Sequence, residues 1–222
     1  MSQSTPPNAI VTIPKEKLAA LPTTHFEGEI IVIDKAEQVE EAINVLRQET
    51  IIGFDTETRP SFRKGHLNKV ALVQLSTHTR CYLFRINLIG LVQPLIDILE
   101  DESILKIGLS THDDFHNLNK LQIIQPAGFV ELQNYVKEFR IADNSLAKIY
   151  AILFGLRVSK GQRLTNWEAE TLTSAQQHYA ALDAKACIQI FEFLKSGAFV
   201  PEDSPYLTVP EPAPATHHEN PQ

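Results

Sequence analysis

Short apolar runs rich in β-branched residues alternate along this chain with segments whose apolar residues recur at helical spacing. The strand-like runs are Glu29–Ile33, Ile51–Phe54, Val70–Leu75, Cys81–Phe84 and Ile104–Leu109. Helical periodicity is found in residues 35–48, 88–99, 114–121, 145–154 and 173–195. This alternation predicts an α/β fold, in which a mixed β-sheet of about five or six strands is flanked by α-helices.

The composition excludes several classes of protein. With 222 residues and 43% hydrophobic residues, the chain is not disordered throughout. No apolar run approaches the roughly 20 residues of a membrane span, and no secretory signal precedes Lys15. Cys81 and Cys187 form neither a CxxC pair nor a zinc-ligand set. We therefore expect a cytoplasmic protein with reduced thiols, no zinc and no membrane contact.

The two ends of the chain differ in composition from its middle. Residues 1–25 are polar and contain four prolines, which predicts a loose N-terminal arm. Residues 201–222 are rich in proline and acids, which predicts a disordered C-terminal tail. One domain is expected between them, over residues 26–200.

The first chemical motif is the run IIGFDTET, in which Asp55 and Glu57 end an apolar strand. Side chains alternate along a strand, so these two carboxylates face the same side. They repel each other unless a cation lies between them. Oxygen ligands of this kind suit Mg²⁺ or Mn²⁺.

Two further segments carry acids. In KIGLSTHDDFHNL, a buried strand leads into a helix near Asp113 and Asp114. Either acid is a candidate; Asp114 is favoured because Leu118, four residues later, gives its helix a face toward the core. In HYAALDA, Tyr179 and Asp183 are also four apart, so they project from one helical face.

Together and in this order, FDTET, KIGLSTHDD and YAALD resemble the three motifs of the DEDD superfamily of 3′→5′ exonucleases. Tyr179, four residues before the last aspartate, resembles the tyrosine of the DEDDy branch. The long link KGQRLTNWEAETLTSAQQHYAALDA most resembles the Werner-syndrome exonuclease and RNase D-like group. The resemblance spans residues 29–196 and implies a ribonuclease H-like fold with two metal ions, Mg²⁺ or Mn²⁺, per site.

The resemblance also implies a role for each matching residue. Asp55 corresponds to the acid that contacts both metals, and Glu57 to one that shares the first metal near the terminal 3′ hydroxyl. Asp114 corresponds to the acid that holds the second metal, and Asp183 to one that completes the first metal's shell. Tyr179 corresponds to the hydroxyl that orients the attacking water.

Two basic segments stand out in a chain of net charge −7. Residues 58–85 carry six basic residues and no acid, and residues 137–163 carry six basic residues against two acids. Nucleic-acid phosphates attract such segments. The predicted nucleic-acid-binding residues are Arg59, Phe62, Arg63, Lys64, Lys160 and Arg163, with Phe62 either stacking on a terminal base or folded onto the domain.

These features predict a metal-dependent 3′→5′ exonuclease acting on the 3′ end of DNA, with RNA as the alternative substrate. Two other functions remain open, namely a scaffold that binds nucleic acid without cutting it and a phosphatase that acts on mononucleotides. The chain has no room for the extra helical domain of RNase D. Substrate grip is therefore expected from the domain itself, a homo-oligomer or a partner protein.

Overall fold

A mixed six-stranded sheet forms the centre of the molecule. A computed structural model describes residues 6–61 and 69–210. The sheet has the order β2-β5-β4-β3-β6-β7, in which β3 pairs antiparallel with β4 and parallel with β6. Its strands are β2 (Glu29–Ile33), β3 (Ile51–Thr58), β4 (Val70–Ser76), β5 (Arg80–Phe84), β6 (Leu105–Gly108) and β7 (Phe129–Glu131). The predicted mixed sheet with flanking helices is confirmed.

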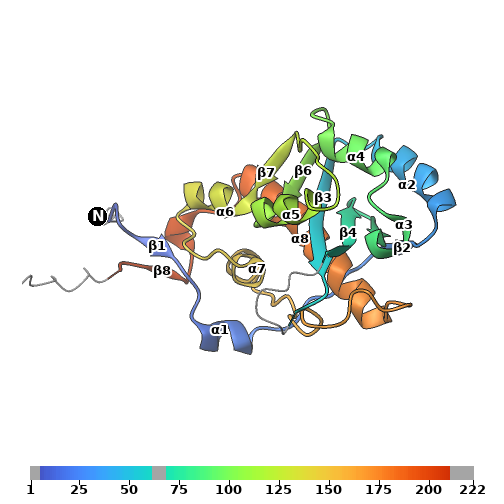
Figure 1. Cartoon of the computed structure of the whole chain (residues 1–222). Helices are drawn as coiled ribbons and strands as arrows, with labels where there is room; N and C mark the ends of the chain where they lie inside the picture. The colour runs from blue at the N-terminus through green and yellow to red at the C-terminus, as the bar shows by residue number, and fades with distance from the viewer. Residues whose placement is uncertain (1–5, 62–68, 211–222) are drawn as a thin grey trace, which may run out of the picture.

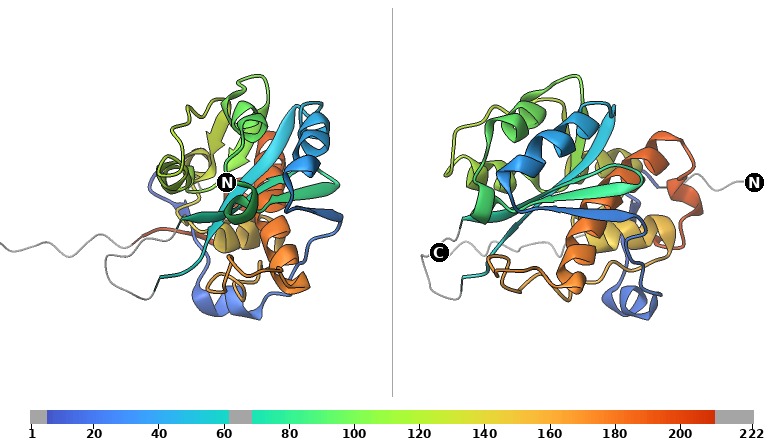
Figure 2. Two further views of the ribbon diagram at one scale, coloured as in Figure 1. Left: turned by 45° about the vertical axis from the view of Figure 1, so that its right-hand side comes forward. Right: turned by 90° about the vertical axis from the view of Figure 1, so that its right-hand side faces the viewer.

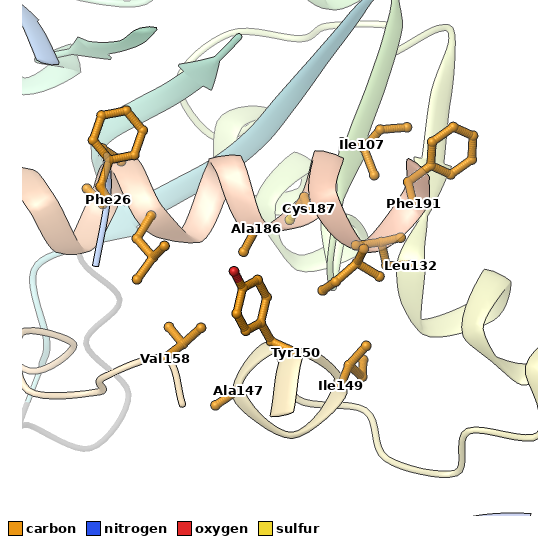
Figure 3. Close-up of a cluster of buried hydrophobic side chains, with 14 of the residues drawn as sticks. Phe26, Ile107, Leu132, Ala147, Ile149, Tyr150, Val158, Ala186, Cys187 and Phe191 are labelled. Atoms are coloured by element: carbon orange, nitrogen blue, oxygen red, sulfur yellow. The ribbon is translucent and has the colours of Figure 1, made fainter. Parts of the chain in front are cut away.

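Helices cover both faces of this sheet (Figures 1 and 2). Their bounds are α1 (Lys15–Ala20), α2 (Val39–Leu46), α3 (Ile86–Ile89), α4 (Gln93–Glu100), α5 (Thr111–Leu118), α6 (Leu132–Tyr135), α7 (Leu146–Phe154) and α8 (Ser174–Lys195). Three short 3-10 turns accompany them, at Ala36–Gln38, Val136–Phe139 and Pro201–Asp203. One hydrophobic core joins the sheet to α7 and α8, and a second joins it to α2, α4 and α5. Figure 3 shows the first core around Tyr150, with Ala147 on the α7 side and Ala186 and Cys187 on α8. In the part of the chain that the structure describes, no helix is long and apolar enough to cross a membrane.

Strand β3 divides its side chains between the two cores. Ile52 and Phe54 are fully buried in the core on the side of α2, α4 and α5. The intervening residue, Gly53, lies against α8, and a Cβ atom built on it would lie 1.9 Å from the carbonyl oxygen of Ala184. Only glycine permits this approach of helix to strand. Gly53 therefore sets α8 directly over β3 at Ala184, the residue that follows Asp183.

Helix α8 begins where the sequence predicted. Thr173 is its N-cap, and its side chain accepts a hydrogen bond from the backbone N–H of Gln176. The Gln176 side chain in turn accepts one from the Thr173 backbone, which completes a capping box. The cap fixes the start of α8, and with it the position of every residue that α8 carries.

Two sequence-based expectations differ from the structure in the middle of the chain. The helix predicted over residues 88–99 is divided into α3 and α4, because Gly90 adopts φ +74° between them and Pro94 lies at the start of α4. Strand β7 and helix α6 were not predicted. Three- and four-residue elements carry too little periodicity to be recognised.

The terminal segments differ as well. Strand β1 (Ile10–Val11) pairs antiparallel with β8 (Leu207–Thr208), on the left of Figure 1. Val11 is fully buried and Ile13 is 1% exposed. The expected loose arm and disordered tail are thus wrong for residues 10–20 and 201–208, because apolar residues spaced among the prolines pack onto the first core. Residues 211–222 lie outside the described residues.

Candidate active site

Strand β3 and helix α8 bring three carboxylates together. Asp55, Glu57 and Asp183 each offer one oxygen, and these oxygens all lie within 4.8 Å of one another. Asp55 and Glu57 share the α8 face of β3 because they are two residues apart. Asp183 reaches them because Gly53 lets α8 lie close to the strand. Three residues predicted as metal ligands are thus brought to one point.

Burial raises the pKa of each acid in this cluster, and neighbouring carboxylates add to the rise at Asp55 and Glu57. Glu57 and Asp183 are 8% exposed. Burial, followed by the charges of Asp183 and Asp114, raises the pKa of Glu57 to about 9. Burial also raises the pKa of Asp183 to about 7, although hydrogen bonding with Tyr179 and the charge of Lys160 oppose the rise. The pKa of Asp55 is raised well above its ordinary value by burial and then by the neighbouring carboxylates. A bound cation would reverse these effects.

The carboxylates fit a divalent metal for a second reason. One oxygen of Asp183, Oδ1, is buried and has no hydrogen-bond partner among the described residues. A buried acceptor without a donor is costly, and a cation would satisfy it. The donor atoms are all carboxylate oxygens, the ligands that hard cations such as Mg²⁺ and Mn²⁺ prefer.

The fourth acid, Asp114, lies apart from this group. It is the fourth residue of α5, and the Thr56 hydroxyl donates a hydrogen bond to its carboxylate. Burial raises the pKa of Asp114 to about 7, with the Thr56 hydrogen bond opposing the rise. The side chain of Asp113 is 84% exposed, and His112 lies 3.7 Å from its carboxylate. The geometry therefore favours Asp114 over Asp113, as the helical spacing predicted.

Glu131 was not predicted, although it fixes the turn that leads into α5. Its carboxylate accepts hydrogen bonds from the backbone N–H groups of Ser110 (2.9 Å) and Thr111 (2.7 Å) and from the Thr111 hydroxyl (2.8 Å). Ser110 has φ +66°, which is unusual for a residue other than glycine. These bonds hold the start of α5, and therefore Asp114, against the end of the sheet.

Tyr179 lies one helical turn before Asp183 on α8. Its ring centroid is 6.1 Å from that of Trp167, which is fully buried. Burial, and then the charges of Asp183 and Glu57, raise the pKa of Tyr179 above its ordinary value. The hydroxyl therefore stays protonated at neutral pH and can donate a hydrogen bond toward the acids.

A pocket of about 330 Å³ opens beside these groups. Asp55, Tyr179 and Asp183 line it, as do the predicted phosphate-binding residues Lys160 and Arg163. No sequence motif predicts the rest of the wall, which is formed by Leu109, Ser110, Asn144, Ser145, Leu146, Ala147, Val158, Ser159 and Cys187. These residues come from three loops, the start of α7 and the middle of α8, so only the folded chain unites them.

Among the other predicted nucleic-acid-binding residues, the structure describes Arg59, which does not line this pocket. The Arg59 guanidinium lies 3.2 Å from the Glu168 carboxylate, an ion pair that ties the end of β3 to the link before α8. Phe62, Arg63 and Lys64 lie outside the described residues.

Solved structures of exonucleases have the same fold as this chain. Escherichia coli RNase D has a similar structure, with a TM-score of 0.67 at 23% identity, covering 77% of this chain and 45% of that one. The exonuclease domain of Aedes aegypti Nibbler matches with a TM-score of 0.69 at 19% identity, covering 82% of this chain and 97% of that one. The chain therefore has the ribonuclease H-like fold of exonuclease domains.

Comparison of the sequence with known families identifies the family of this chain. The chain belongs to the 3′-5′ exonuclease domain family of the DEDD superfamily, which it matches over residues 30–197. Mouse "Bifunctional 3'-5' exonuclease/ATP-dependent helicase WRN" is 32% identical over 184 residues, which cover 78% of this chain and 13% of that protein. This chain thus corresponds to a small part of that relative.

Proposed function

We propose that this chain is a two-metal-ion 3′→5′ exonuclease, which hydrolyses phosphodiester bonds from the 3′ end of a nucleic acid. The observation that carries the proposal is the meeting of Asp55, Glu57 and Asp183 within 4.8 Å. Membership of the 3′-5′ exonuclease family supports it. The convergence of buried acids would destabilise the fold unless cations were bound between them.

The proposed roles follow from where each side chain lies. Asp55, Glu57 and Asp183 would hold one divalent ion, and Asp114 with Asp55 would hold a second. When bound, Mg²⁺ or Mn²⁺ lowers the pKa of a water and stabilises the leaving 3′ oxygen. The protonated Tyr179 hydroxyl donates a hydrogen bond that orients the attacking water. Lys160 and Arg163 hold phosphates of the substrate in the pocket.

The relatives include proteins named for helicase-linked exonuclease activity and others named RNase D, so DNA and RNA both fit the family. Our sequence-based preference for DNA stays a prediction, as does a cytoplasmic location. A non-cutting scaffold is disfavoured because all four acids and Tyr179 are present.

A digestion series with matched DNA and RNA tests the proposal. Strands labelled at the 5′ end should shorten in single steps with Mg²⁺ or Mn²⁺, and chelator should abolish the reaction. A circular single strand should survive. Rapid cutting of the circle would contradict the 3′→5′ polarity, and release of phosphate from mononucleotides alone would indicate a phosphatase.

A further inference from the structure

A second groove, lined by basic residues, continues from the catalytic pocket. It has a volume of about 350 Å³ and lies between α1, the start of α7 and the segment after α7. Its walls share Ser145, Ala147, Val158 and Lys160 with the catalytic pocket, so the two cavities lie side by side. The basic residues that line it are Lys15, Lys148, Arg157 and Lys160, and no carboxylate lines it.

Helix α1 forms one wall of this groove and is anchored at both ends. Before it, Asp143 accepts hydrogen bonds from the Thr12 hydroxyl (3.0 Å) and the Ile13 backbone N–H (2.9 Å). After it, the Arg157 guanidinium donates to the Thr23 hydroxyl at 2.8 Å. The wall therefore has a fixed position, and Lys15 projects from it into the groove.

The charge of the groove opposes that of the whole chain. The chain carries a net charge of −7, yet four cations line this cavity. Lys148 is paired with Asp143 at 2.5 Å, which leaves a net positive lining. The floor between the cations is apolar, from Leu18, Ala19, Ala147 and Val158. Such a surface suits a sugar-phosphate backbone, because phosphates contact the cations while apolar atoms of the sugars and bases cover the floor.

We propose that this groove binds the substrate strand on the 5′ side of the terminal nucleotide. The inference rests on the proposed function and extends it, since the groove lies outside the carboxylate cluster. In this role, α1 binds nucleotides of the substrate that are not being cleaved. The occupant is a single strand of DNA or RNA.

Binding of strands of different length tests the groove. In an Asp55→Asn background, which prevents cleavage, fluorescence anisotropy compares a trinucleotide with a dodecanucleotide. Lys15→Glu should weaken dodecanucleotide binding about 3- to 10-fold and reduce the salt dependence by about one phosphate contact. Trinucleotide binding should not change, because the short strand is held by the catalytic pocket.

The matched control is Lys17→Glu, which makes the same charge change on the same helix at an exposed residue that does not line the groove. It should leave both affinities unchanged. An equal loss in the two variants, or an equal loss for both strand lengths, would overturn the groove assignment. A parent protein that neither binds nor shortens any strand would instead overturn the proposed exonuclease function.

A separate observation concerns Gln74 on β4. It lies directly opposite Asp55 in the antiparallel pair, so both side chains project from the α8 face of the sheet. Gln74 is 0% exposed, and neither its amide nitrogen nor its amide oxygen has a hydrogen-bond partner among the described residues. A wholly buried, unpaired amide destabilises the fold, so its presence calls for a partner.

We infer that Gln74 is a positioning residue for the Asp55 carboxylate when a metal is bound. Asp55 would then hold the cation, and the Gln74 amide would donate a hydrogen bond to the Asp55 carboxylate. Substitution of groups that orient metal ligands in this way commonly costs about 10- to 100-fold in metal affinity.

The Gln74→Leu variant separates this role from a structural one. Leucine fills the site without an unpaired polar group, so the metal-free protein should melt at the same or a higher temperature. Mn²⁺ affinity, measured by titration calorimetry, should nevertheless fall about 10-fold. Gln74→Met serves as a second replacement if Gln74→Leu folds poorly. Unchanged Mn²⁺ affinity in a stable variant would refute the role.

Discussion

The two sides of β3 supply the acids of the site in different ways. On the α8 side, Asp55, Glu57 and Asp183 meet through direct packing of helix on strand, which Gly53 permits. On the α5 side, Asp114 is positioned by a hydrogen bond from Thr56 and by the turn that Glu131 stabilises. One proposed metal position is therefore built by packing, while the other depends on hydrogen bonds. Substitutions on the two sides should therefore lower activity for different physical reasons.

The largest effect is expected on the packed side. Asp55→Asn removes the charge shared by both proposed ions and should lower kcat about 10³-fold or more. The metal-free fold should be retained, because the change relieves repulsion among buried acids. Single-turnover digestion and a thermal melt together measure this. A variant that keeps near-normal turnover would remove Asp55 from the centre of the site.

On the hydrogen-bonded side, Asp114→Asn should lower turnover about 10²- to 10³-fold, through loss of one ligand. Asp113→Asn is the matched control, because it makes the same change at the neighbouring exposed residue. It should stay within a few fold of the parent protein. If Asp113 proves the essential acid, the assignment of the second motif is wrong by one residue.

Tyr179→Phe tests whether the packed side supplies more than metal ligands. The change keeps the ring beside Trp167 and deletes the hydroxyl. Stability and nucleic-acid affinity should hold, while the single-turnover rate falls about 10²-fold, which is typical of a positioned hydrogen-bonding group. An unchanged rate at saturating metal would leave Tyr179 with a packing role only.

Glu131→Gln tests how strongly the α5 side of the site depends on the turn that Glu131 holds before α5. A glutamine keeps the shape but presents one NH₂ group to backbone donors, so the start of α5 loosens. We expect turnover to fall about 10-fold, with the loss partly recovered at high Mn²⁺ concentration. An equal loss at all metal concentrations would show that Glu131 does not act through metal binding.

The smallest effect is a pH dependence of stability. The pKa values of Glu57, Asp114 and Asp183 are raised to about 9, about 7 and about 7. The folded state thus holds these protons more tightly than the unfolded chain. The stability they contribute is complete below about pH 4 and is lost as the pH rises toward 7 to 9.

Added Mg²⁺ should offset this loss, because the ion binds the ionised acids. The rise in Tm on adding Mg²⁺ should therefore grow from about pH 6 to about pH 9, reaching a few degrees. Glu57→Gln should flatten the trend and Asp113→Asn should not. A metal-induced shift that falls with pH would contradict the raised pKa values.

Much of the packed side could be predicted from sequence, since local spacing alone places Asp55 with Glu57 and Tyr179 with Asp183 on shared faces. The spacing also favoured Asp114 over Asp113. Glu131 and Gln74 could not be predicted, because their roles arise from contacts across strands distant in sequence. The groove depends on α1, whose six residues carry no core pattern, so the sequence predicts a loose arm there.

The pairing of β1 with β8 gives the chain ends a structural role. Trimming residues 6–14 would delete the buried side chains of Val11 and Ile13, each worth about 1.5–3 kcal/mol of burial. It would also leave β8 without its partner strand and release the anchor at Thr12 and Ile13 that precedes α1. A shortened chain chosen from the motif boundaries alone would therefore behave as a core mutant, and its loss of activity would say nothing about catalysis.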